Sequence, residues 1–350
     1  MILPSKKEVL HTLLTKASEA GAAPGMSYAL VTKTEYILDY LGNRRLLPSP
    51  QPVTGDTLYD LASLTKVVAT TTAILQLMES GEFCLSTPVS RILPQYQNPT
   101  VTIKHLLTHT SGHAADINCL NMTDRRELVD AIYADRIKEE NFDRKVIYSD
   151  IGYIILGFVI EHVTGSLETY VTDHILKPLE MTHTFYNPPA KQMELCAATE
   201  YDKQSGRIIQ GVVHDEKCRL LGGITGHAGL FSTSLDMVKF MQMLLNRGIL
   251  NDQMILNPST VQVLFQNHTK GMGTNRGLGW IHPYSENDIC DFISDESLYH
   301  TGFTGTSALA DIKAGKGFIL LTNRVHPSRE NTGLVTLRHT FNNAAVSAII

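Results

Sequence analysis

The sequence predicts an α+β fold, in which an antiparallel sheet is flanked by helices and interrupted by a mostly helical insertion. Three observations favour this class. Strand-like segments lie near both ends of the 350-residue chain, helical patterns fill most of the middle, and no segment repeats internally. A hydrophobic content of 43% is enough for a sizeable core. We therefore expect distant parts of the chain to complete one sheet.

The N-terminal part is predicted to contain a helix, two strands and a second helix. Segment 1–21 spaces its apolar residues as an amphipathic helix does, and charges interrupt it, so it does not resemble a signal peptide. Segment 25–42 is predicted to form two strands that meet around Lys33 and Thr34. Segment 63–80 then carries an apolar stripe with helical spacing, and Gly81 is a natural stop.

The middle of the chain, residues 85–211, is expected to form a mostly helical domain. One helix is predicted in the segment MTDRRELVDAIYAD, with Thr123 as its cap. Another is predicted over 151–163, and it should end near Gly165. Between these helices the sequence pattern indicates loops.

The C-terminal part is predicted to return to the sheet. A helix should begin near Ser234, and the segments GLGW, TSALADI and GFILLTN should form strands, with a hairpin turn at 313–317. From residue 330 onward the pattern is helical again. We expect residues 1–84 and 212–350 to form the sheet domain, with the active site between it and the helical domain.

Charge and composition exclude several classes of function. The net charge of −5 provides no basic surface for nucleic acid. The longest apolar stretch begins at Ile151, contains Glu161 and His162, and is shorter than the ~20 residues of a membrane span. The five cysteines are scattered without a C-x-x-C pair, which favours reduced thiols over disulfides or a metal site. We therefore expect a cytoplasmic protein.

The segment LYDLASLTKVVATTTAILQLMESG places a serine three residues before a lysine. Ser63 and Lys66 would lie on one face of a helix. Serine is a weak nucleophile that needs a base nearby, and a lysine can act as one if its ammonium is partly desolvated. Because S-x-x-K is common by chance, an N-capping serine beside a solvated lysine is the simpler interpretation of this segment alone.

Two further motifs follow in order. IYSDIGY supplies Tyr148 and Asp150 just before a helix, and YHTGFTGTSALADI supplies His300, Thr301 and Gly302, expected to enter a strand. In this order the chain resembles the serine β-lactamase and penicillin-binding-protein superfamily, on the branch of class C β-lactamases, D-aminopeptidases and related esterases. That family has S-x-x-K, then Y-x-N, then K-T-G or H-T-G. The segments HLLTHTSG, GHAGLFST, GLGW and LLTNRVHP extend the similarity to about residues 24–327.

The resemblance implies a β-lactamase/transpeptidase-like fold and an acyl-enzyme mechanism. Ser63 would attack a carbonyl, and Lys66 and Tyr148 would share the proton transfers. The backbone N–H groups of Ser63 and Phe303 would form the oxyanion hole. The residues that the resemblance assigns to substrate binding are Asp150, His300, Thr301, Gly302 and Phe303.

One position departs from the family pattern, because Asp150 stands where Y-x-N has asparagine. An ionised aspartate accepts hydrogen bonds but cannot donate one, and its charge would raise the pKa of Lys66. We therefore expect poor handling of β-lactams and favour Tyr148 as the general base. The alternative is that Asp150 caps the helix that begins at Ile151.

Metal and cofactor sites lack their sequence patterns. His105, His109 and His113 are spaced by four residues, but HLLTH has leucine where a zinc-protease helix has glutamate. The chain also contains no G-x-x-x-x-G-K-[ST], no G-x-G-x-x-G and no G-x-S-x-G. We expect neither a metal nor another cofactor.

The expected activity is that of a serine hydrolase acting on an ester or amide. A cell-wall-fragment amide and a small ester are the main candidate substrates, and a D-Ala-D-Ala carboxypeptidase or β-lactamase is the alternative. A non-catalytic acyl-binding sensor is an alternative of another class, which the intact Ser63, Lys66 and Tyr148 disfavour. The expected partner is a small-molecule or peptide substrate, and the sequence leaves the oligomeric state open.

Overall fold

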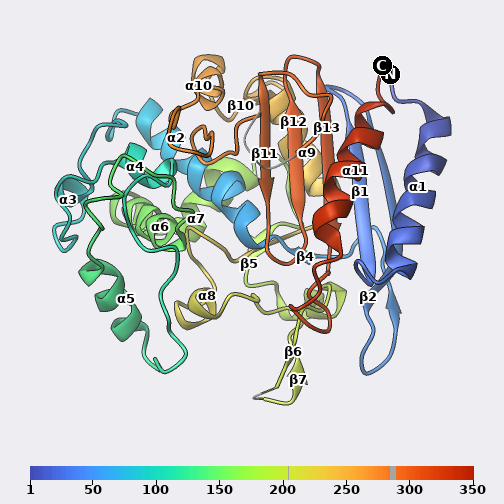
Figure 1. Cartoon of the computed structure of the whole chain (residues 1–350), viewed down its shortest axis with the longest axis horizontal. Coiled ribbons are helices and arrows are strands. Elements are labelled where there is room, and N and C mark those ends of the chain that lie inside the picture. The colour runs from blue at the N-terminus through green and yellow to red at the C-terminus, as the bar shows by residue number, and fades with distance from the viewer. Residues whose placement is uncertain (204, 284–288) are drawn as a thin grey trace.

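A six-stranded sheet forms one side of the molecule, and helices from the middle of the chain gather beside it (Figure 1). The computed structural model describes residues 1–203, 205–283 and 289–350. The strand order is β11-β12-β13-β1-β2-β3, and each neighbouring pair is antiparallel. Since β1 pairs with β13, the two ends of the chain complete one sheet, and the predicted α+β class is confirmed.

The elements have the following bounds. The strands of the main sheet are β1 (Gly25–Val31), β2 (Tyr36–Arg45), β3 (Gln51–Pro52), β11 (Ser297–Thr301), β12 (Ser307–Asp311) and β13 (Lys316–Thr322). The short strands outside it are β4 (Tyr59–Asp60), β5 (Phe185–Tyr186), β6 (Tyr201–Asp202), β7 (Arg207–Ile208), β8 (Leu230–Ser232), β9 (Ile249–Leu250) and β10 (Gln253–Met254). The α-helices are α1 (Pro4–Glu19), α2 (Thr72–Glu79), α3 (Val89–Ile92), α4 (Ile103–Leu107), α5 (Arg125–Ala134), α6 (Asp150–Thr164), α7 (Leu167–Val171), α8 (Glu216–Leu220), α9 (Ser234–Leu245), α10 (Pro258–Leu264) and α11 (Leu334–Val346). The 3-10 and π segments are η1 (Ala62–Leu64), η2 (Lys66–Thr71), η3 (Thr172–Leu176) and η4 (Ala190–Leu195).

Both faces of the sheet are buried, and β1 explains how. Successive side chains of a strand point to opposite faces. Met26, Tyr28 and Leu30 belong to the core beneath α1 and α11, whereas Ala29 and Val31 belong to the core on the side of α9. Helices thus cover the sheet on both sides.

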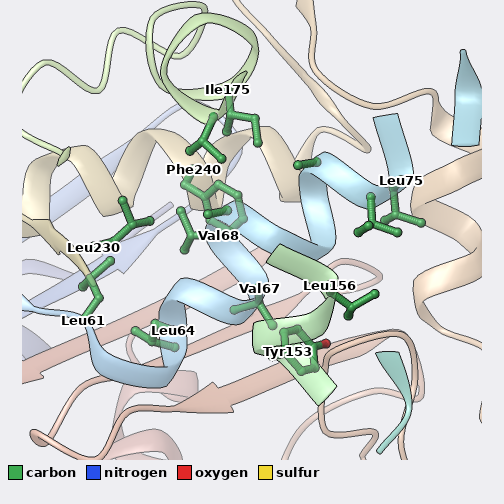
Figure 2. Close-up of a cluster of buried hydrophobic side chains, with 14 of the residues drawn as sticks. Leu61, Leu64, Val67, Val68, Leu75, Tyr153, Leu156, Ile175, Leu230 and Phe240 are labelled. Carbon is green, nitrogen blue, oxygen red and sulfur yellow. The ribbon is translucent and has the colours of Figure 1, made fainter. Parts of the chain in front are cut away.

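The segment that carries Ser63 and Lys66 runs through the larger core (Figure 2). Val67 and Val68 are buried there, beside Tyr153 of α6 and Phe240 of α9. A segment packed on all sides has little freedom to move, because protein interiors are close-packed. The core therefore holds the S-x-x-K pair in a fixed geometry.

The helix predicted over 63–80 is present but is not uniformly α-helical. It consists of the 3-10 turn η1, the π-helical segment η2 and the α-helix α2. Three consecutive threonines mark the change: Thr70 donates to the Gly226 carbonyl at 2.6 Å, and Thr72 donates back to the Val67 carbonyl at 2.9 Å. Such hydroxyl bonds give the backbone an alternative to regular helical hydrogen bonds, and π segments are frequent at functional sites.

Three local predictions were wrong. Asp124 caps α5 in place of Thr123, since its carboxylate accepts from the Arg126 N–H at 2.8 Å. GLGW does not form a strand, since its Gly279 has φ +77°. The segment is instead the turn that connects Arg276 to Ile281, two residues that pair as an isolated antiparallel β-bridge. The H-T-G residues end β11 and do not open a strand. The helices predicted over 151–163, from Ser234 and after residue 330 are present as α6, α9 and α11.

In the described parts of the chain, no single helix has the length and apolar character needed to cross a membrane. The bent pair Asp150–Thr164 and Leu167–Leu176, which meets at 84°, passes that test only when its two helices are taken together. Most of α6 is buried within the larger core.

Gly226 lies where α6 and the segment before β8 approach most closely. A Cβ at this position would lie 2.1 Å from the Tyr153 carbonyl oxygen. We expect Gly226→Ala to lower the free energy of unfolding by about 2 kcal/mol, as overpacking in a core does. Chemical denaturation would measure this. Gly55→Ala is the control, because its Cβ would have only the Tyr40 ring as a neighbour, at 3.9 Å. Equal stability of the two variants would contradict the close approach.

Candidate active site

Ser63 lies in a tight turn that the neighbouring strands hold in place. Ala62 has φ +47°, a conformation uncommon for a residue other than glycine, and its N–H donates to the Asp60 carboxylate at 2.9 Å. The Thr304 hydroxyl donates to the Asp60 carbonyl at 2.7 Å, and the Thr306 hydroxyl donates to the Leu61 carbonyl at 2.9 Å. The turn after the H-T-G residues therefore fixes the segment that presents Ser63.

A cavity of about 510 Å³ opens in front of Ser63. Seven of the eight residues predicted for the site line this cavity: Ser63, Tyr148, Asp150, His300, Thr301, Gly302 and Phe303. The eighth, Lys66, is fully buried and bonded to Ser63. The structure thus brings all eight together from the N-terminal, middle and C-terminal parts of the chain.

Lys66 uses its three ammonium hydrogens on three different acceptors. Its Nζ lies 3.0 Å from Ser63 Oγ, 2.8 Å from Asp150 Oδ1 and 3.1 Å from the His227 carbonyl oxygen. Burial alone would lower the pKa of Lys66, but the Asp150 carboxylate and the Tyr148 side chain outweigh it, so the pKa is raised above its usual value. Lys66 is therefore an ammonium that donates to Ser63.

Asp150 is the carboxylate partner of Lys66 and not a helix cap. Ser149 is the N-cap of α6, because its side chain accepts from the Gly152 N–H at 3.3 Å. The alternative interpretation of Asp150 as the cap was therefore wrong. Burial acts to raise the pKa of Asp150, but Lys66 and His227 lower it overall, so the carboxyl is ionised.

Tyr148 lies beside Lys66 at the wall of the cavity. Lys66 Nζ is 5.0 Å from the centre of the Tyr148 ring. The His109 ring packs against the same tyrosine with ring centres 4.6 Å apart, and His109 Nδ1 accepts from the Ser149 N–H at 3.0 Å. The histidine thus supports the short segment between Tyr148 and α6.

The H-T-G residues lie at the end of β11, where the centre of the His300 ring is 6.1 Å from that of Tyr148. Burial, and then the charges of Arg276 and Lys66, keep the pKa of His300 well below its usual value, so the ring is neutral. Its Nδ1 lies 2.9 Å from the Thr301 carbonyl oxygen. A Cβ on Gly302 would lie 2.4 Å from the Leu61 carbonyl oxygen, so only glycine permits this close contact with the segment before Ser63.

Phe303 forms part of the rim. Its ring stacks on His214 with centres 5.6 Å apart, and the Arg324 guanidinium lies 4.9 Å from the ring centre. The side chain is partly exposed at the cavity, where it can contact an apolar substrate group. The assignment of the Ser63 and Phe303 N–H groups to an oxyanion hole remains a prediction.

A charge network behind Asp150 was not predicted from the sequence. Lys217 is buried, and its Nζ lies 2.9 Å from Asp116, 3.0 Å from Asp215 and 3.7 Å from Asp150. His227 Nε2 lies 2.9 Å from Asp215. The sequence signal was only a charged stretch at the start of α8, of the kind that ordinarily forms a solvated surface.

Asp150, Asp215 and His227 place three ligand atoms within 4.8 Å of one another, a spacing that metal ligands also show. The Lys66 and Lys217 ammonium groups lie within ion-pair distance of the same carboxylates. Two ammonium ions repel a further cation. We therefore interpret the group as an ion-pair network.

The three histidines of the possible zinc pattern have separate surroundings. His105 bonds to Thr102 at the start of α4, and His113 lies 2.5 Å from Asp135. His109 follows the end of α4 and contacts Tyr148. Because α4 ends at Leu107, the helical spacing that suggested a shared ligand face does not apply.

Basic side chains also surround the cavity. Arg276, Arg324 and Arg338 line it. Asn323 is buried and bonds to the backbone, since its Oδ1 accepts from the Gly25 N–H at 2.9 Å. The Arg276 guanidinium carbon lies 5.2 Å from the centre of the Tyr148 ring.

The cavity therefore contains a serine whose hydroxyl oxygen accepts from a buried lysine, a tyrosine beside that lysine, and a neutral histidine at the end of a strand. This arrangement on an α+β fold defines the class of serine hydrolases with an S-x-x-K nucleophile.

Comparison with known proteins identifies the family. Residues 10–340 match the family model described as Beta-lactamase. A protein of Escherichia coli (strain K12) named "Putative D-alanyl-D-alanine carboxypeptidase" is 34% identical over 316 residues, which cover 80% of this chain and 72% of the relative. The chain therefore belongs to the beta-lactamase family of serine hydrolases.

Solved structures share the fold. "A class C beta-lactamase" has a TM-score of 0.78 at 21% identity, covering 99% of this chain and 97% of the other. "EstCE1, a hydrolase with promiscuous acyltransferase activity" also has a TM-score of 0.78, at 20% identity, covering 97% and 98%. The predicted resemblance to the superfamily and its fold is confirmed.

Proposed function

We propose that the protein cleaves an ester or amide through an acyl-enzyme on Ser63, with Tyr148 as the general base. The observation that carries the proposal is the 3.0 Å hydrogen bond from Lys66 Nζ to Ser63 Oγ at the cavity wall. A lysine whose three hydrogens are all donated has no lone pair with which to accept the serine proton. The geometry therefore favours Tyr148 for that step.

In the proposed reaction, Tyr148 enters as the phenolate, and Ser63 Oγ attacks the substrate carbonyl carbon while its proton passes to the Tyr148 oxygen. The carbonyl oxygen becomes an oxyanion, which the N–H groups of Ser63 and Phe303 would stabilise. The bond to the leaving group then breaks, and Tyr148 returns its proton to that group. Water attacks the acyl-enzyme by the same route and releases the acid. Lys66 stays charged and holds the serine oxygen in place.

The substrate proposal starts with peptides that end in D-alanine, because the E. coli relative is named a putative D-alanyl-D-alanine carboxypeptidase. A small ester is the second candidate, which the partly exposed Phe303 at the cavity rim favours. Other cell-wall-fragment amides belong to the same proposal. A cytoplasmic location also remains a prediction, which cell fractionation would test.

A panel of substrates would test this proposal. We would assay a D-Ala-D-Ala peptide, muramyl peptides, p-nitrophenyl esters and nitrocefin with the native protein. The proposal expects release of D-alanine or of nitrophenol above the background of the uncatalysed reaction. A protein that binds these compounds without turnover of any would instead be an acyl-binding sensor.

Asp150 is expected to limit the reaction with β-lactams. An ionised carboxylate repels the carbonyl oxygen that an asparagine would bind. We expect Asp150→Asn to speed the acylation by nitrocefin and penicillins, measured by stopped-flow absorbance. Asp116→Asn is the control, because Asp116 contacts Lys217 but is not an ion-pair partner of Lys66. Slower acylation in Asp150→Asn, or equal acceleration in both variants, would contradict this role.

A further inference from the structure

Asp60 is a buried carboxylate whose two oxygens both accept from backbone N–H groups. It ends the short strand β4, and only 2% of the residue is exposed. Its Oδ1 accepts from the Ala62 N–H at 2.9 Å, and its Oδ2 accepts from the His214 N–H at 2.7 Å. A buried carboxylate is costly unless it is hydrogen-bonded. The two N–H bonds compensate for the burial of Asp60 and tie two segments of the cavity wall to it.

The bond to Ala62 holds an unfavourable backbone conformation directly before the nucleophile. Ala62 has φ +47°, in the left-handed region that residues other than glycine rarely adopt. Such a conformation persists only where the surrounding contacts hold it. The peptide group between Ala62 and Ser63 carries the Ser63 N–H. The contact with Asp60 therefore helps to set the direction of that N–H.

Asp60 is also bonded to the segment that carries Phe303. The Thr304 hydroxyl donates to the Asp60 carbonyl oxygen at 2.7 Å, and Thr304 is the next residue after Phe303. The ring of His214 stacks on the Phe303 ring, with an angle of 23° between the two planes. Asp60 thus contacts the residue before Ser63, the residue after Phe303, and the segment whose ring supports Phe303.

We propose that Asp60 is a positioning residue that fixes the Ser63 and Phe303 N–H groups relative to each other, so that both point at the oxyanion. Donors stabilise an oxyanion best when they are aimed in advance at the position it will occupy. A displacement of either N–H therefore weakens binding of the transition state more than binding of the substrate. This role rests on the proposed function, because the oxyanion hole belongs to the acyl-enzyme reaction.

Asp60→Asn tests this role, because an amide has one acceptor oxygen and can satisfy only one of the two N–H groups. The kcat and KM for the best substrate of the panel would be compared with those of the native protein. We expect kcat to fall about tenfold to a hundredfold, less than the roughly hundredfold or greater loss on deleting a whole oxyanion donor. KM should change by less than about threefold. The rate at which a fluorophosphonate labels Ser63 should fall with kcat.

Asp236→Asn is the matched control. Asp236 is also a buried carboxylate that accepts a backbone N–H, from His183 at 2.7 Å, but it belongs to α9 and is not part of the described cavity wall. Its kcat should equal that of the native protein when equal amounts of folded protein are compared. Chemical denaturation of each variant would give the folded fraction.

Thr304→Val is a second variant, which leaves the carboxylate intact. It removes the hydroxyl that donates to the Asp60 carbonyl, and it should also lower kcat with little change in KM. If Asp60→Asn does not fold, the result for Thr304→Val decides.

Several outcomes would contradict this role of Asp60. An unchanged kcat in Asp60→Asn would overturn it, and so would a rise in KM alone, which would indicate a contact with the substrate. A loss that Asp236→Asn shares, or that a smaller folded fraction explains, would make Asp60 merely structural and also overturn it. A native protein that neither turns over the panel nor is labelled at Ser63 would contradict the proposed function itself, and the role of Asp60 with it. An active native protein with unaffected variants would contradict the role of Asp60 alone.

Discussion

Replacing Ser63 by alanine should reduce turnover by a factor on the order of a million, the loss seen when other serine hydrolases lose their nucleophile. The hydroxyl removed in Ser63→Ala is the one that Lys66 contacts at 3.0 Å in the cavity. The fold should be unaffected, because the turn around Ser63 is held by Asp60, Thr304 and Thr306. Turnover of the best substrate from the panel would be compared at equal protein concentration.

A matched serine outside the cavity controls for the general effect of the substitution. Ser27 of β1 is buried and bonds to Tyr59 at 2.9 Å. Ser27→Ala makes the same substitution but removes a hydroxyl from the core and not from the cavity. Its effect on turnover should therefore be slight. If Ser63→Ala kept most of the activity, the nucleophile would have to be another group.

The second large effect is expected at Lys66 and Tyr148, which we expect to act as one unit. Lys66→Ala removes the donor to Ser63, and Tyr148→Phe removes the proposed base. Because each step needs both groups, either single variant should lose nearly as much turnover as the double variant. Circular dichroism must accompany the kinetics, because Lys66→Ala also leaves the half-buried Asp150 carboxylate without its closest ion-pair partner.

The double-mutant cycle has a clear contrary outcome. If the losses of the two single variants multiplied to give that of the double variant, Lys66 and Tyr148 would act independently. The proposed coupling, in which Lys66 holds the oxygen while Tyr148 takes the proton, would then be wrong.

Much of the sheet and of the site could be predicted from the sequence. The periodic spacing of apolar residues predicted helices such as α6 and α9, and Gly165 correctly indicated the end of α6. The three motifs keep a fixed order, and this order identified the residues around the cavity although they are far apart in the chain. The division into residues 1–84 with 212–350 and residues 85–211 remains our proposal for the domains.

The residues that the sequence did not reveal depend on contacts between distant segments. Lys217 lies in a charged stretch and Arg276 stands between Asn275 and Gly277, and both local sequences are typical of a surface. Their function depends on which acids and rings the fold places beside them, and no local pattern records that. The cap of α5 shows the same limit on a small scale, because Thr123 and Asp124 are both good caps and only the backbone geometry chooses between them.

Covalent labelling of Ser63 tests the central claim most directly. The native protein would be treated with a fluorophosphonate probe, digested, and analysed by mass spectrometry. We predict that the mass of the probe is added to the peptide that contains Ser63, and that Ser63→Ala abolishes the label. Labelling at another residue, retained in Ser63→Ala together with full activity, would contradict the account.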